Sequence, residues 1–188
     1  MFKELYSRLT GLIFKPAETW AKLKQREEEQ ETFLSRYLYP LMGLIALAAF
    51  VGVLFSRKEF SLEIALKSAI KALISNMGGF FLAVYLMNEL WRSVFRRHKD
   101  RTLWYCFAGY ASALMFVLSM VLALLPEFFF FRAAVLYTAY MIWEGAPVYM
   151  QVDEKERLKF TACASAVIIV MPQAIDYLLF LLMPGMRF

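Results

Sequence analysis

A chain of 188 residues in which 61% are hydrophobic and 17% are aromatic is too apolar for a soluble domain, because soluble domains contain roughly 45 to 50% apolar residues. The net charge of +5 rests on 21 Lys and Arg residues that collect in short segments, which indicates membrane topology and argues against nucleic acid as a partner. The single histidine and the lack of G-x-S-x-G, P-loop and G-x-G-x-x-G motifs argue against an enzyme, a metal site or a cofactor.

The first 13 residues predict an amphipathic helix that lies in the membrane interface. Its apolar face holds Phe2, Leu5, Tyr6, Leu9, Leu12 and Ile13. Lys3, Glu4 and Arg8 are expected to lie off that face. Pro16 ends this helix or starts the next one.

The following segment, up to residue 36, is polar and predicts a solvated cytoplasmic helix. Trp20 is expected to anchor it at the membrane interface. An acidic cluster comprises Glu27, Glu28, Glu29 and Glu31. The alternative is that this cluster docks a protein partner at the cytoplasmic face. Residues 1–36 are therefore expected to form cytoplasmic and interfacial helices, ahead of a five-span domain over residues 37–188.

Five apolar blocks follow, and each is long enough for a helix to cross a hydrocarbon core of about 30 Å, which needs about 20 residues. The blocks are Tyr37–Phe55, Ala72–Trp91, Thr102–Pro126, Phe128–Val152 and Phe160–Met186. None alternates as a barrel strand would, and only helices satisfy their own backbone in lipid. The predicted fold is all-α: an integral membrane five-helix bundle with amphipathic and cytoplasmic helices at its N-terminus, and the lipid bilayer is its first partner.

Three segments that alternate with the spans carry most of the basic residues. They are the N-terminal segment, the loop with Arg92, Arg96, Arg97, Lys99 and Arg101, and the loop with Lys155, Arg157 and Lys159. The positive-inside rule then places the N-terminus in the cytoplasm and the C-terminus outside. The second span is expected to extend as one helix of roughly 45 Å from Ser61, a good N-cap, to Trp91.

Four charged residues remain at membrane depth, where a central charge costs about 3 kcal/mol and requires a partner, access to the interface or protonation. They are Glu89, Arg132, Glu144 and Asp176. Arg132 and Asp176 both fall in the outer half and are predicted to form an ion pair. A polar pocket on the cytoplasmic side is predicted from Glu89, Tyr110, Tyr140 and Glu144. These groups either fix which helices are neighbours or line a substrate or ion site.

The stretch MIWEGAPVYM, residues 141–150, places a carboxylate, a glycine and a proline in an aromatic run. Gly145 and Pro147 are expected to break or kink the fourth span beside Glu144. We expect the Glu144 carboxylate to lie inside the bundle and not toward lipid.

Several segments together resemble the Yip domain family, the Ypt/Rab-interacting proteins, in a compact bacterial form. They are FKPAETW before the first span, YCFAGYASAL at the start of the third, the hairpin LLPEFFFF, the tyrosine-rich LYTAYMIWEG and the small-residue LKFTACASAV. The family often has a proline about four positions after its Gly-Tyr pair, whereas Leu114 follows Gly109 and Tyr110 here. The resemblance implies a five-helix membrane fold and, from eukaryotic relatives, a part in vesicle traffic and binding of prenylated Rab GTPases. Compactness points to a bacterial inner membrane.

The sequence therefore favours a non-enzymatic, membrane-embedded binding or organising module of the Yip type. A small transporter or ion channel that uses the intramembrane carboxylates is the main alternative. An adaptor that acts through the acidic cytoplasmic helix is another, and a homo-oligomer is compatible with each.

Overall fold

The computed structural model describes residues 2–26, 28–56, 61–98 and 100–182, and every regular element in these ranges is helical. The expected all-helical fold is thus confirmed. Glu27 of the acidic cluster, Lys99 of the basic loop and the predicted end of the fifth span at Met186 lie outside the described residues.

Three helices of the described ranges are long and apolar enough to cross a membrane: Gln30–Phe55, Leu62–Ser93 and Glu154–Leu182. A fourth crossing results if the bent pair Arg101–Ala111 and Ala113–Leu124 counts as one span. The protein is therefore a membrane protein with several spans.

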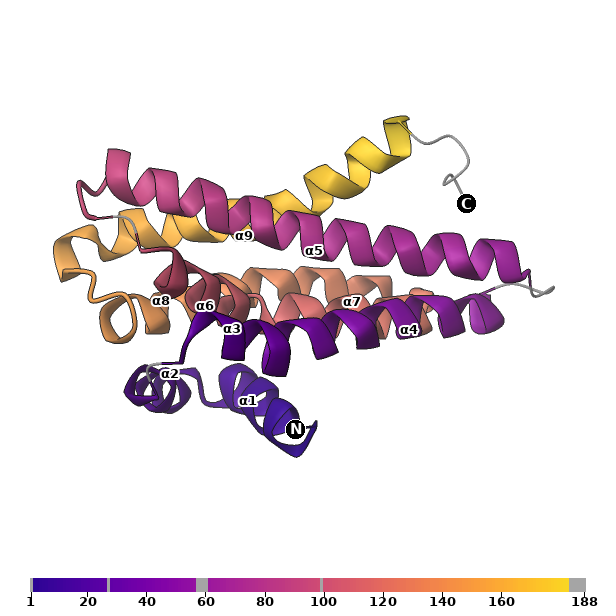
Figure 1. Ribbon diagram of the computed structural model, residues 1–188, viewed down its shortest axis with the longest axis horizontal. Helices are drawn as coiled ribbons and strands as arrows, with labels where there is room; N and C mark the ends of the chain where they lie inside the picture. Colours follow the sequence, from indigo (N-terminus) through magenta and orange to yellow (C-terminus); the bar gives the residue numbers. More distant parts are fainter. Residues whose placement is uncertain (1, 27, 57–60, 99, 183–188) are drawn as a thin grey trace.

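The helical segments run back and forth along the long axis of the molecule (Figure 1). The N-terminal helices are α1 (Phe2–Phe14) and α2 (Pro16–Gln25). The first crossing joins α3 (Gln30–Phe33), the π-helical η1 (Leu34–Leu38) and α4 (Tyr39–Ser56) without a break. The later elements are α5 (Leu62–Ser93), α6 (Arg101–Ala111), α7 (Ala113–Leu124), the 3-10 helix η2 (Pro126–Leu136), α8 (Tyr137–Val148) and α9 (Glu154–Leu182).

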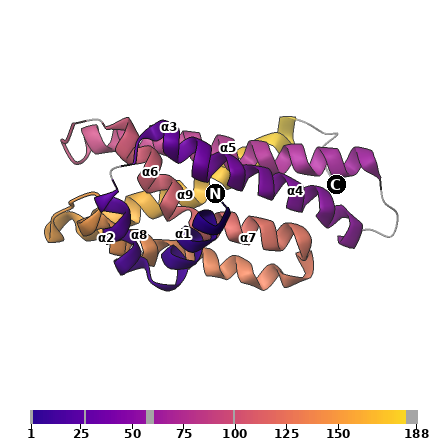
Figure 2. The ribbon, with the colours of Figure 1, turned by 60° about the horizontal axis from the view of Figure 1, so that its bottom comes forward.

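The two ends of the bundle differ in charge. At one end α5 and α8 finish and α6 and α9 begin, and the arginines of the 92–101 loop collect there; we call it the basic end. At the other end α4 finishes and α7 turns into η2 (Figure 2); we call it the distal end. The basic loops thus collect at one end as expected from the sequence, but within the described residues only three of the five predicted spans, or four with the bent pair, are long and apolar enough to cross a membrane.

The fourth predicted span forms from two kinds of helix. The 3-10 helix η2 is followed without a gap by α8. The backbone is kinked at Phe128; beyond this kink, at rises of about 2.0 and 1.5 Å per residue, the rest of η2 and α8 together extend about 34 Å, which exceeds the ~30 Å of a hydrocarbon core. Because a 3-10 helix rises further per residue than an α-helix, η2 lets this segment reach the length of the neighbouring helices although α8 is short.

The third predicted span is bent instead of straight. Helices α6 and α7 meet at Ser112 with an angle of 45°. The Ser112 hydroxyl donates a hydrogen bond of 2.7 Å to the carbonyl of Ala108, a contact that bends helices. The bend thus forms although Leu114 stands where the family often has proline.

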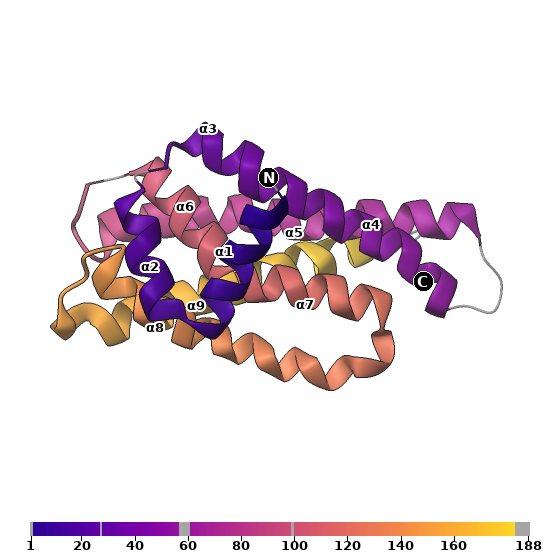
Figure 3. The ribbon, with the colours of Figure 1, turned by 90° about the horizontal axis from the view of Figure 1, so that it is seen from below.

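The helices α1 and α2 pack across α6, α7 and α8 near the basic end (Figure 3). Leu5, Leu12 and Trp20 belong to the same hydrophobic core as the bundle. The expectation that Trp20 anchors at the interface is wrong, because its side chain is 0% exposed. Exposed Phe2 and Tyr6 leave part of the predicted apolar face of α1 free to contact lipid, and Phe14 at the end of the helix is exposed as well.

Two glycines allow helix backbones to approach closely. A Cβ atom at Gly52 of α4 would lie 1.8 Å from the carbonyl oxygen of Ala123 in α7, and one at Gly79 of α5 would lie 2.4 Å from the Cα atom of Pro172 in α9. Close approach of this kind is a principal means of helix association in membranes.

We predict that Gly79→Ala lowers the stability of the bundle by about 1–3 kcal/mol, because the added methyl group overlaps backbone atoms that cannot rotate away. Gly78→Ala is the matched control, since its Cβ would lie 3.6 Å from the Ile175 side chain, an ordinary contact. Both changes raise helix propensity equally. Thermal unfolding in detergent measures the difference, and equal midpoints for the two variants would contradict the close α5–α9 contact.

Candidate functional site

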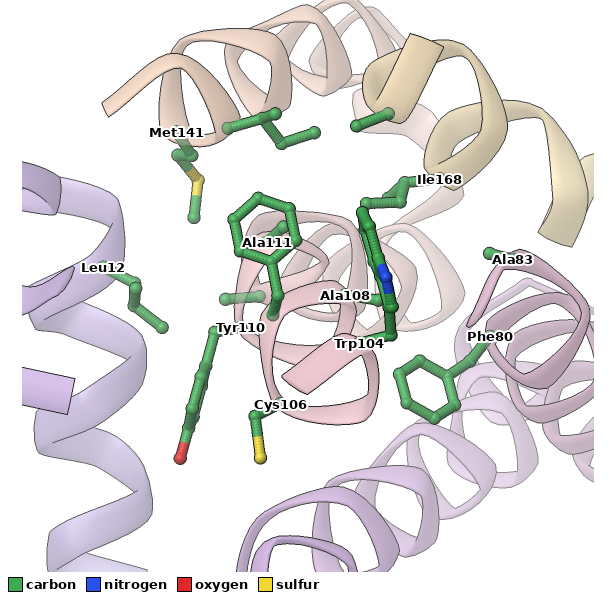
Figure 4. Packing of buried hydrophobic residues seen from close by; sticks show 14 of the residues in the cluster. Leu12, Phe80, Ala83, Trp104, Cys106, Ala108, Tyr110, Ala111, Met141 and Ile168 are labelled. Carbon is green, nitrogen blue, oxygen red and sulfur yellow. The ribbon is translucent and has the colours of Figure 1, made fainter. Parts of the chain in front are cut away.

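Helix α6 lies at the centre of the bundle, with α1, α8, α9, α5 and the first crossing around it (Figure 4). Every residue from Cys106 to Ala111 is buried. Small residues make this possible: a Cβ at Gly109 would lie 2.2 Å from the Cζ atom of Phe33. The neighbouring Tyr110 directs its hydroxyl away from the α6 axis, where it meets α1 and the α2–α3 connection.

A buried charge cluster forms around that hydroxyl. The Arg8 guanidinium donates hydrogen bonds to both carboxylate oxygens of Glu28, at 2.7 and 3.1 Å, and one of 2.7 Å to the Tyr110 oxygen. Tyr110 donates in turn to Glu28. The guanidinium also donates to Glu4 at 2.9 Å. These four residues, which we call the Arg8 cluster, join α1, the α2–α3 connection and α6.

Burial makes it costly to break the pair of Arg8 and Glu28. Their side chains are 10% and 8% exposed, and removing one partner of a buried pair leaves a charge that is costly to desolvate. The Glu4 carboxylate is 45% exposed, so solvent screens its contribution. Hydrogen bonds from Arg8 and then Arg26 lower the pKa of Glu4 from 4.5 to about 2, and its contribution is therefore present above pH 4.5 and lost as the pH falls toward 2.

Two expectations about these residues are wrong. Arg8 was expected off the apolar face of α1, but positions 5, 8, 9 and 12 share the buried face. Glu28 was expected to be a solvated member of the acidic cluster, but it is the counter-ion of Arg8. The only signal in the sequence was the spacing of Arg8 within the Leu5–Leu12 face, which places it on the helical stripe that packs inward.

Trp20 of α2 packs into α8 at the site of the unusual MIWEGAPVYM stretch. Its indole N–H donates a hydrogen bond of 2.9 Å to the Met141 carbonyl. A Cβ at Gly145 would lie 2.6 Å from the indole Cε2 atom. Gly145 thus provides the space that the indole ring occupies.

Pro147 leaves a backbone carbonyl of α8 free to accept hydrogen bonds from α9. Because proline has no N–H, the carbonyl four residues earlier, at Trp143, lacks its helical partner. The Arg157 guanidinium donates two hydrogen bonds to that oxygen, at 3.2 and 3.0 Å, and lies 4.2 Å from the centre of the Trp143 ring. Helix α8 continues to Val148 in spite of the proline, so the break expected beside Glu144 does not occur there.

Tyr110 forms its hydrogen bonds with Arg8 and Glu28, and not with the other residues of the predicted polar pocket. Glu144 is half-buried on α8, one turn beyond Tyr140, which is 46% exposed. Glu89 is half-buried near the end of α5. A role for these three residues stays a prediction.

A second site, at the distal half of the bundle, holds both members of the predicted ion pair. A cavity of about 730 Å³ is lined by residues of α4, α5, α7, η2 and α9. Its polar lining comprises Ser75, Asn76, Ser119, Arg132, Gln173 and Asp176. We call it the distal cavity.

Asp176 has a different cationic partner from the one expected. Its carboxylate lies 3.4 Å from the Lys71 ammonium and accepts a hydrogen bond of 3.1 Å from Ser75. Arg132 lines the same cavity, and the described part of the chain shows no ion pair between it and Asp176. Lys71 was overlooked because partners were sought only among charges inside the five apolar blocks, and Lys71 directly precedes the block Ala72–Trp91, although the long helix expected from Ser61 to Trp91 does form.

Comparison with protein families shows that residues 10–175 match the Yip1 domain. The chain belongs to the Yip1 domain family. The match covers most of the chain and confirms the resemblance seen in its motifs. Comparison with curated proteins and with solved structures gives no match.

The structure gives the Gly-Tyr pair of this Yip1 domain a physical role. Gly109 makes room for Phe33 of α3, and Tyr110 binds Arg8 of α1 and Glu28. The pair is therefore the place where the N-terminal helices meet the centre of the bundle. Arg8 and Asp176 lie just outside the two ends of the matched range.

We predict that Arg8→Met lowers the free energy of unfolding by about 3 kcal/mol, because it leaves the Glu28 carboxylate buried and unpaired. Adding Glu28→Met is expected to recover at least half of that loss, since no buried charge then remains. Denaturant unfolding in detergent, followed by tryptophan fluorescence, measures both.

The matched control is Lys15→Met, which removes the cation of the Lys15–Glu18 pair, with side chains 70% and 64% exposed. Its expected effect is below about 0.5 kcal/mol. An Arg8→Met variant as stable as this control would show that the Arg8 cluster does not hold the N-terminal helices.

Proposed function

We propose that this Yip1 domain protein is a non-enzymatic, membrane-embedded binding module that holds an amphiphilic ligand in the distal cavity. Members of the family are generally non-enzymatic membrane proteins associated with trafficking. The cavity volume of about 730 Å³ falls within the range of roughly 300–1,000 Å³ typical of ligand sites. Its mixed polar and apolar lining suits a molecule with a polar head and an apolar tail.

The observation that favours binding over conduction is the contrast between the two halves of the bundle. The distal half contains the cavity. The half toward the basic end is filled by aromatic rings: Trp91, Trp104, Phe107 and Phe160 have exposed fractions of 4% or less, and the rings of Trp104, Phe107 and Phe160 lie 5.7 to 6.0 Å apart. A cavity in one half of the bundle and a dry aromatic core in the other half support a binding site more than a path across the membrane.

The charge distribution supports an orientation with the basic end in the cytoplasm. In this orientation the N-terminal helices lie on the cytoplasmic side and the distal cavity opens in the outer half of the bilayer. We propose the bacterial inner membrane as the location, as the resemblance to bacterial members of the family implies. A soluble protein partner would meet the cytoplasmic surface of α1 and α2.

The position of Glu28 weakens the case for an adaptor that acts through the acidic segment. Glu28 is already bound by Arg8 and Tyr110. A partner would therefore compete with an internal ion pair for this residue, and only the exposed acids remain available to it.

We predict that the purified protein in liposomes produces no flux of protons or small ions above that of protein-free liposomes, because the aromatic core closes the basic half. A pH-sensitive dye trapped inside reports the flux, and Glu144→Gln and Asp176→Asn are measured in parallel. All three proteins are expected to match the empty liposomes. A flux that decreases in either variant would identify a transporter or channel and exclude the binding module.

A further inference from the structure

We propose that the ligand of the distal cavity is an anionic phospholipid, whose phosphate group is bound by Arg132. This inference rests on the proposed function and names the chemical class of the ligand. It follows from the charge balance of the cavity, the level of Arg132 in the membrane and the shape of the opening.

The charge balance leaves one cation for the ligand. Asp176 is paired with Lys71 and Ser75. The Ser119 hydroxyl donates to the Asn76 side chain at 3.1 Å, and the Gln173 amide donates to the Ile169 carbonyl of its own helix at 3.1 Å. Within the described residues, the Arg132 guanidinium has no hydrogen bond or ion pair. A cation at membrane depth is stabilised by an anionic partner or by access to the interface, and a lipid phosphate offers both, since it matches the planar guanidinium in two hydrogen bonds.

The position of Arg132 along η2 matches the level of lipid phosphates. It follows directly after four exposed rings, Phe128 to Phe131, and such aromatic belts lie at the headgroup level of a bilayer. Four residues of 3-10 helix separate it from the kink at Phe128 near the distal turn, which corresponds to about 8 Å. Its guanidinium therefore lies close to the headgroups of the adjacent leaflet.

The opening of the cavity favours a lipid over a phosphate from solution. Leu136, Tyr177 and Phe180, which line the cavity, are 74%, 63% and 42% exposed, so they form an apolar rim. The C-terminal end of α9 diverges from α5 on this side (Figure 1). Acyl chains can lie against this rim, while a hydrated ion gains nothing from it.

The test uses native mass spectrometry of the full chain in mild detergent, with added phosphatidylglycerol or phosphatidylcholine of identical acyl chains. We expect the wild type to bind phosphatidylglycerol about tenfold more tightly, a difference of about 1.4 kcal/mol. Arg132→Gln is expected to remove most of this preference. Inorganic phosphate at millimolar concentration is expected neither to bind nor to displace the lipid.

Two further variants distinguish a specific site from general attraction. Arg92→Gln removes an exposed cation at the basic end and is expected to keep the preference. Asp176→Asn removes the one carboxylate that lines the cavity among the described residues and releases Lys71, so it is expected to bind phosphatidylglycerol at least as tightly as the wild type. All variants are first compared by thermal unfolding, and Arg132, which is exposed, is expected to be dispensable for folding.

The outcomes separate the ligand class from the function. Equal binding of both lipids with no effect of Arg132→Gln would overturn the assignment to an anionic phosphate while leaving a lipid-binding module. Loss of binding in Asp176→Asn would show a site for a cationic group instead. Failure of every lipid to bind would overturn the assignment and the proposed function together.

Discussion

A buried arginine needs a counter-ion, and that need determines how the N-terminal part of this protein is arranged. Arg8 lies on the face of α1 that also carries Leu5, Leu9 and Leu12, so the helix cannot bury its leucines without burying the guanidinium. Glu28 and Tyr110 provide the acceptors. Their positions fix the α2–α3 connection on one side and the central helix α6 on the other. The N-terminal helices are thereby part of the same hydrophobic core as the membrane bundle.

Residues that usually weaken helices are points of contact in this fold. Gly145 admits the Trp20 ring, Gly109 admits Phe33, and Gly79 lies against Pro172. Pro147 leaves the Trp143 carbonyl without its helical partner, and Arg157 binds that oxygen. In lipid, where helices gain little from hydrophobic burial against each other, close packing and satisfied polar groups are the main sources of association.

The sequence predicted the helical class, the apolar segments and their alternation, because hydropathy and loop charge depend on residues close together in the chain. It placed Trp20 and Glu28 wrongly, since their partners Met141 and Arg8 are remote in sequence and an amphipathic Trp is equally typical of an interface. The predicted pairing of Arg132 with Asp176 rested only on the expected depth of both residues in the membrane. Depth cannot distinguish Arg132 from Lys71, which reaches the same carboxylate from a helix longer than the bilayer requires.

The basic half of the bundle has an aromatic core and carries the docked N-terminal helices, whereas the distal half holds a polar cavity. This arrangement requires that α1 and α2 are fixed on the bundle. Electron spin resonance between labels at two exposed sites, Ser7 of α1 and Arg92 of α5, tests this in lipid nanodiscs. A single narrow distance distribution is predicted. A broad distribution, as expected for a helix that moves freely in the membrane interface, would contradict the account.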